Sequence, residues 1–195
     1  GNWPGVTVEH KEGKAQIDGK EITVVDLPGI YSLSATSEDE KSARDFLLSG
    51  SADLVINIID STLLERNLYL TTQLMEMQVP MVLLLNMSDL AENEGTDINL
   101  NEFKEHLTLP AEKISATSSS DKKKVHELIR TGLAQQPIPI QHIQYPNEVE
   151  DIISKWYPSL IQPAEEYKVS PRWIGVKIIE GDNKILKLVE RYSDL

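Results

Sequence analysis

The chain has 195 residues, 40% hydrophobic and 26% charged, with 19 Lys and Arg against 31 Asp and Glu, a net charge of −12. This composition excludes a disordered chain, and the acidity argues against a general nucleic-acid binder, because such binding depends on neutralising phosphates. The absence of Cys excludes disulfides and thiolate sites, and no apolar stretch of the sequence approaches the ~20 residues that span a bilayer.

The first predicted unit is an antiparallel hairpin. Apolar and polar residues alternate on both sides of Asp18-Gly19, a strong type I′ turn signal, and the second strand ends near residue 25. After it, Ser37 and Glu40 have the spacing of a capping box, which predicts a helix that ends near residue 49.

Two later segments have the continuous hydrophobicity of parallel strands that are buried on both faces. They are residues 54–59 and 81–85, and residues 63–78 between them have apolar side chains at helical spacing. Such a strand–helix–strand unit is a parallel crossover. A helix at 99–107, a strand at 113–115 and a helix at 122–134 continue the alternation. The predicted fold class is α/β, a mainly parallel sheet with one antiparallel edge strand.

The pattern changes near residue 135, where a proline-rich stretch without clear periodicity predicts a linker. Beyond it, Asn147 marks a helix that ends near residue 155, Pro171 precedes a helix at 172–180, and Asp182 caps a third at 183–191. We therefore expect an α/β domain at residues 1–136 and a small all-α domain at 137–195.

Three polar motifs each follow a predicted strand: Asp26-Leu27-Pro28-Gly29, Asn86-Met87-Ser88-Asp89 and Ser115-Ala116-Thr117. At the carboxyl end of a strand, Asp26 can hold a Mg²⁺-bound water, and the amide of Gly29 can reach a terminal phosphate. Asp89 can accept hydrogen bonds from N1–H and the 2-amino group of guanine, and adenine would leave it unpaired. Each motif alone is also a common turn or helix cap. Their order at successive strand ends predicts a guanine-nucleotide-binding fold like that of the P-loop GTPases.

The sequence also resembles the bacterial ferrous-iron transport protein B family. The matching strings are Asn-Trp-Pro-Gly-Val-Thr at 2–7, the segments 26–33, 65–70 and 86–89, and, in the tail, 172–173 and 180–182. The resemblance implies a cytosolic GTPase region on the inner face of the bacterial membrane, followed by a membrane domain that passes Fe²⁺. It implies that the intact protein hydrolyses GTP to GDP and phosphate with Mg²⁺.

The resemblance also implies roles for individual residues. Thr7 matches a switch I ligand of Mg²⁺, and Asp26 and Gly29 match switch II contacts. By this match, Asp26 binds Mg²⁺ through a water, and Thr7 and Gly29 are the catalytic candidates. The guanine contacts are assigned to Asn86, Met87, Asp89, Ser115, Ala116 and Thr117. The partners that the resemblance implies are a guanine nucleotide and the transporter's own membrane domain. A homo-oligomer is left open, and no nucleic acid is expected as a partner.

The chain departs from the usual GTPase pattern at three places. Met87 stands where most GTPases have Lys, and Ile30 stands where many have a water-orienting Gln, so slow intrinsic turnover is expected. No Gly-x-x-x-x-Gly-Lys-[Ser/Thr] loop occurs in the 195 residues, because Gly13 to Gly19-Lys20 has one intervening residue too many and continues with Glu21. In the family this loop precedes Asn2-Trp3, so we expect the sequence to begin after it.

Two other functions remain open at this point. A GTPase-like interaction module that binds no nucleotide would explain the absent phosphate loop. A soluble GTPase of ribosome assembly would share the motifs, but the weak basic character and the lack of an RNA-binding pattern in the tail argue against it.

The 195-residue polypeptide alone is expected neither to hydrolyse GTP nor to bind it tightly. The phosphate loop normally supplies charge-assisted hydrogen bonds of roughly 1.5–3 kcal/mol each, and losing several moves a roughly micromolar site toward millimolar. Titration with fluorescent GTP and a phosphate-release assay, beside a chain that extends further upstream, test this. Micromolar affinity in the short polypeptide would contradict the expectation.

Overall fold

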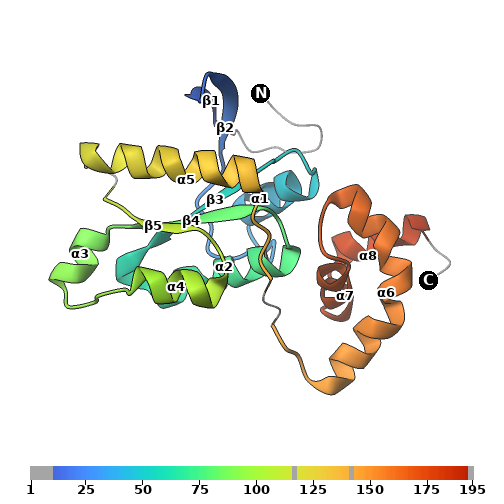
Figure 1. Cartoon of the computed structure of the whole chain (residues 1–195). Coiled ribbons are helices and arrows are strands. Elements are labelled where there is room, and N and C mark those ends of the chain that lie inside the picture. Colours follow the sequence, from blue (N-terminus) through green and yellow to red (C-terminus); the bar gives the residue numbers. More distant parts are fainter. Residues whose placement is uncertain (1–10, 116–117, 141–142, 193–195) are drawn as a thin grey trace.

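A parallel three-stranded sheet forms the centre of the α/β part of the molecule (Figure 1). The computed structural model describes residues 11–115, 118–140 and 143–192. Its strands β3 (Val55–Asp60), β4 (Met81–Asn86) and β5 (Ala111–Lys113) lie in that order. Asp60 pairs with Asn86, so β3 and β4 end at the same edge of the sheet. The predicted parallel unit is confirmed.

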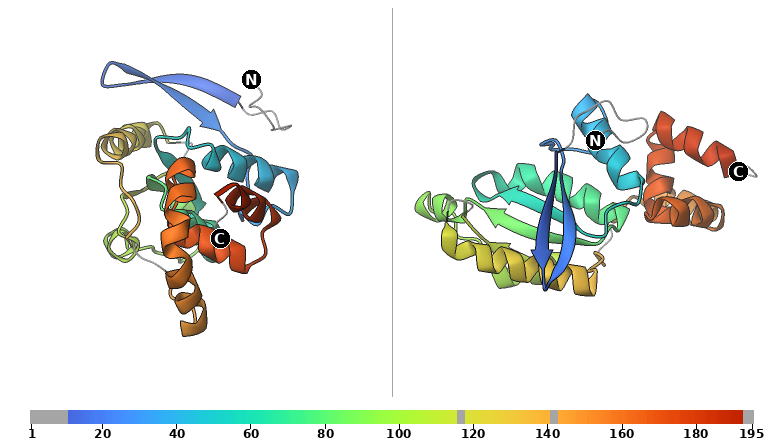
Figure 2. Two further views of the ribbon diagram at one scale, coloured as in Figure 1. Left: turned by 90° about the vertical axis from the view of Figure 1, so that its right-hand side faces the viewer. Right: turned by 90° about the horizontal axis from the view of Figure 1, so that it is seen from above.

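The predicted hairpin is also present, as β1 (Lys11–Ile17) and β2 (Lys20–Asp26). Its turn residues Asp18 and Gly19 both have positive φ, 50° and 77°, as a type I′ turn requires. Within the described residues the two strands pair with each other and form a sheet of their own. Figure 2 shows this hairpin extending across helix α5 (Lys122–Gln135). The α/β class, with an antiparallel strand pair beside a parallel sheet, is confirmed.

The two faces of the parallel sheet pack against different helices. Val82 and Leu84 of β4 face α5 and form a small core with Leu128. The alternate side chains of β4 face the other layer, which contains α2 (Leu64–Met77) and α4 (Leu100–Leu107), and join the main core. Helix α5 lies very close to the sheet at Gly132, where a Cβ would come within 2.7 Å of Leu54 and 2.8 Å of Val82.

In the α/β part, the boundaries of the other predicted elements agree with the sequence patterns, with one shift. Helix α1 (Glu38–Leu48) begins with the predicted capping box of Ser37 and Glu40. Helix α3 (Ser88–Asn93), which the sequence patterns did not predict, follows β4 directly. Strand β5 occupies 111–113 and not 113–115, because its pairing ends where Leu85 of β4 meets Lys113. Ser115 therefore lies in the loop beyond the strand.

The tail is helical, as predicted, with α6 (Asn147–Tyr167), α7 (Pro171–Ile179) and α8 (Asn183–Val189). The expected end of the first helix near residue 155 is wrong, because α6 continues through Pro158 and Pro163. Each proline frees a carbonyl four residues earlier, at the exposed Ser154 and Ser159, where water can bind it. Burial of the helix face that contains Ile153, Leu160 and Ala164 favours the longer helix.

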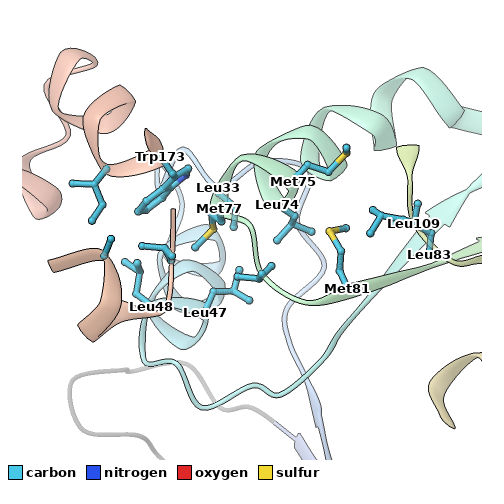
Figure 3. Close-up of a cluster of buried hydrophobic side chains, with 14 of the residues drawn as sticks. Leu33, Leu47, Leu48, Leu74, Met75, Met77, Met81, Leu83, Leu109 and Trp173 are labelled. Carbon is cyan, nitrogen blue, oxygen red and sulfur yellow. The ribbon is translucent and has the colours of Figure 1, made fainter. Parts of the chain in front are cut away.

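One continuous core joins the helical tail to the α/β part (Figure 3). Trp173 of α7, only 1% exposed, belongs to the same cluster as Leu47 and Leu48 of α1 and Met77 of α2. The backbone supports this contact, since Ser170 donates to the Met77 carbonyl at 2.8 Å. The division into domains at 1–136 and 137–195 stays a prediction.

A buried ion pair reinforces this junction. The guanidinium of Arg44 in α1 contacts the carboxylate of Asp182, and their side chains are 5% and 15% exposed. Asp182 also caps α8, accepting from the amides of Lys184 at 3.0 Å and Ile185 at 3.2 Å. The start of α8 is thus bound to α1.

Replacing Arg44 by Ala should lower the free energy of unfolding by about 3 kcal/mol, because it leaves a largely buried carboxylate without its cation. Arg130→Ala is the matched control: Arg130 forms an exposed pair with Glu127 at 2.5 Å, and because water screens this pair its loss should lower the stability far less. Urea denaturation measures both variants. Equal losses would show that the buried pair does not stabilise the junction.

Candidate functional site

The loop after β4 contains the predicted base-binding residues. Asn86 ends β4, and Asp89 is exposed in the first turn of α3. Met87 between them has φ 56° and ψ 28°, a left-handed conformation that costs roughly 1–2 kcal/mol for a residue with a Cβ. This tight turn presents a carboxamide and a carboxylate on either side of an exposed methionine. Such a pair can recognise the hydrogen-bonding edge of a guanine base.

The loop after β5 is held by an aspartate. The amide of Ser115 donates to Oδ2 of Asp121 at 2.9 Å, and Lys124 contacts Oδ1 of the same carboxylate at 2.9 Å. The hydrogen bond from Ser115, and then Lys124, keep the pKa of Asp121 below its ordinary value. Ala116 and Thr117, the other predicted residues of this loop, lie outside the described residues.

Backbone hydrogen bonds bring these two loops together. The amide of Ser88 donates to the carbonyl of Ile114 at 3.3 Å, and the amide of Ile114 donates to the carbonyl of Leu85 at 2.9 Å. Ser115 follows directly. The segments that contain Asn86, Asp89 and Ser115 are therefore bound to each other at the carboxyl edge of the sheet, as the order of the motifs predicts.

Asp26 and Gly29 lie on a different part of the structure. Asp26 ends β2 of the hairpin, and Gly29 lies in the exposed loop between β2 and α1. A Cβ at Gly29 would meet nothing within 4 Å, so packing does not require glycine there. The neighbouring Ile30 packs against the main core. Thr7 lies outside the described residues.

The segment after Gly29 is bound to α2 by two contacts. The amide of Leu33 donates to Oε1 of Gln73 at 2.6 Å in the buried interior. The guanidinium of Arg66 lies 3.7 Å from the centre of the Tyr31 ring, a close cation–π contact. The loop that contains Gly29 therefore touches the helix that follows β3.

A polar network binds the linker and tail to the far end of α2. Oη of Tyr145 donates to Oε1 of Glu76 at 2.6 Å, and burial followed by this hydrogen bond raises the pKa of Tyr145. Arg172 donates to both oxygens of Glu150, at 2.5 and 2.6 Å, and to the Ile143 carbonyl at 2.8 Å.

Sequence reasoning missed several polar residues of this edge. Asp60, the last residue of β3, accepts from the amide of Thr62 at 2.9 Å, and Ser61 is buried at 1% exposure. Ser88 is part of the predicted motif but received no role. A polar residue directly after a buried strand was the available signal for Asp60 and Ser61. Asp121 had no such signal, because only the folded loop brings its carboxylate to Ser115.

The carboxylates of the described residues are spread over the structure. No group of three or more His, Cys, Asp or Glu side chains with the arrangement of a metal site occurs in the described ranges. Mg²⁺ usually binds proteins through one or two carboxylates together with phosphate oxygens and waters. The exposed carboxylate of Asp26 fits such a site. Across the part of the chain that the structure describes, no helix is long and apolar enough to cross a membrane.

Comparison with known proteins gives the family. Residues 1–130 match the family Ferrous iron transport protein B, and residues 145–195 match the FeoB cytosolic helical domain. The Fe(2+) transporter FeoB of Escherichia coli (strain K12) is 39% identical over 188 residues, which cover 93% of this chain and 24% of that protein. The chain thus spans about a quarter of the length of the curated relatives it matches.

Solved structures agree with this match. The cytosolic domain of the T. maritima FeoB iron transporter in a GDP form superposes with a TM-score of 0.85 at 34% identity, over 99% of this chain and 76% of that one. Its GMPPNP form gives 0.84 at 34% identity, over 99% and 75%. The FeoB G-domain from Methanococcus jannaschii gives 0.62 at 41% identity, over 68% and 85%. Sequence and structure together show that the chain belongs to the ferrous iron transport protein B (FeoB) family and comprises its cytosolic G-domain and helical-domain regions.

Proposed function

We propose that this chain is the GTP-binding, GTP-hydrolysing regulatory region of a bacterial ferrous-iron transporter, at the cytoplasmic face of the inner membrane. The observation that carries the proposal is the turn from Asn86 to Asp89, which is bound through Ser88 to the loop after β5 at one edge of the sheet. Ligands of open α/β sheets bind at this edge. The GDP and GMPPNP forms of the T. maritima relative support a guanine nucleotide as the ligand.

In this proposal Asp89 accepts from N1–H and the 2-amino group of guanine, and Asn86 bonds near N7. The amides of the loop at Ser115, Ala116 and Thr117 approach the guanine carbonyl oxygen, and the stem of Met87, whose side chain is partly exposed, covers the base edge. Adenine lacks both donors and would leave the carboxylate unpaired. The site is thus selective for guanine through hydrogen bonds, which discriminate more strongly than shape alone.

For the phosphates, we assign Thr7 and Asp26 to Mg²⁺, with Asp26 acting through a water, and Gly29 to the terminal phosphate. Mg²⁺ neutralises charge on the phosphate oxygens when it is bound. Ile30 packs into the core, so another side chain or backbone group must orient the attacking water, and slow turnover follows. The 195-residue polypeptide alone should hold the phosphates weakly, since it contains no Gly-x-x-x-x-Gly-Lys-[Ser/Thr] loop.

Asp89→Asn in the full-length protein should change the base preference. The new amide donates where the carboxylate accepted, so the 2-oxo group of xanthine becomes the better partner, and the preference for GTP over XTP should fall by at least about 10²-fold. Competition binding measures the ratio, and Glu94→Gln, an exposed change at the other end of α3, should leave it unaltered. An unchanged preference would remove Asp89 from base recognition. Wild-type protein that binds no guanine nucleotide would favour the interaction-module alternative.

Gly29→Ala should separate stability from catalysis. Nothing lies within 4 Å of the added Cβ, so the melting temperature should stay the same. A methyl group beside the terminal phosphate would displace it, and GTP hydrolysis by the full-length protein should fall by up to about 10²-fold while its GDP affinity is kept. The control is Gly13→Ala in β1, which also has open space for its Cβ and should alter neither quantity. Normal hydrolysis by Gly29→Ala would argue against a phosphate close to Gly29.

A further inference from the structure

Two buried serines connect the ends of neighbouring strands at the proposed base site. Ser61 follows β3 directly, Ser88 is the first residue of α3 after β4, and they are 1% and 6% exposed. Their Oγ atoms are 3.3 Å apart. Because both side chains are buried, we consider a role for them in binding that acts through other residues.

The hydrogen-bond directions in this pair follow from counting protons. Ser88 Oγ donates to the carbonyl of Leu85 at 2.7 Å, which uses its only proton. Ser61 must therefore donate to Ser88. The amide of Ser88 donates in turn to the Ile114 carbonyl at 3.3 Å. Ser88 alone thus bonds to Leu85 near the end of β4, to Ser61 directly after β3, and to Ile114, the residue before Ser115.

The backbone turn at Met87, next to these bonds, is strained. Met87, at φ 56°, lies between Asn86 and Ser88, so the backbone would gain by leaving this conformation. The bonds of Ser88 act immediately beyond Met87 and oppose that relaxation. Without them, the first turn of α3, which contains Asp89, can move relative to Asn86.

We propose that Ser88, held by Ser61, is a positioning residue for guanine recognition, which fixes Asp89 relative to Asn86 and so determines selectivity for the 2-amino group. This inference rests on the proposed guanine site. It predicts that removing a buried hydroxyl that never touches the nucleotide alters which base is preferred.

The test compares GDP with inosine diphosphate, which lacks the 2-amino group, in the full-length protein. Ser88→Ala should weaken the affinity for GDP by about tenfold and the affinity for inosine diphosphate by less, so that the ratio of the two affinities falls. Ser61→Ala keeps the hydrogen bond from Ser88 to Leu85, so it should lower the affinity ratio less than Ser88→Ala does. The double variant should be no worse than Ser88→Ala, because that single change leaves the Ser61 proton without its acceptor. Isothermal titration calorimetry gives the affinities.

Thr71→Val is the matched control. Thr71 Oγ1, which is fully buried, accepts from Asn57 Nδ2 at 2.8 Å between α2 and β3, so its loss should lower the melting temperature without altering the ratio. An unaltered ratio in Ser88→Ala, or an equal fall in Thr71→Val, would overturn the inference. If Ser88→Ala does not fold, Ser61→Ala is judged by the same criteria. Failure of the proposed function would look different: the wild-type protein would bind neither nucleotide, or Asp89→Asn would keep the GTP preference.

Discussion

Strand β4 is buried along almost its whole length, and the rest of the molecule is organised around it. Val82 and Leu84 pack against α5, whereas Met81, Leu83 and Leu85 belong to the main core on the other face. A strand packed on both faces cannot slip in register, because a shift of one residue would exchange its two faces. The end of β4 is therefore a well-determined point in space, and Asn86 lies there.

The rigidity of that point matters for the proposed site, because recognition of a planar base requires hydrogen-bonding groups in a fixed relation to each other. The turn at Met87 is strained, and the strain persists because the surrounding bonds of Ser88, Leu85 and Ile114 outweigh it. The loop after β5 is held in turn by the carboxylate of Asp121. Both loops are thus positioned by hydrogen bonds within the protein.

The helical tail is part of the same packed unit and not an independent appendage. Trp173 lies in the main core (Figure 3), and Arg44 and Asp182 join α1 to α8. The loop that contains Gly29 leads into α1 and is bound to α2 through Gln73. Helices α1 and α2 thus contact both the proposed phosphate side of the site and the helical tail. That loop is therefore joined to the tail through packed helices.

The sequence by itself determined the class of fold, most of the strands and helices, and the positions of the three motifs. Those features depend on local patterns: the turn at Asp18-Gly19, the capping box at Ser37, and the continuous apolar runs of the parallel strands. Only tertiary structure decided the length of α6, since burial of Leu160 and Ala164 outweighs two prolines. It also decided the contacts of Ser61 with Ser88 and of Asp121 with Ser115, and the burial of Arg44 beside Asp182. These pairs join residues on different elements, and no local pattern in the sequence records which distant side chain completes a buried hydrogen bond.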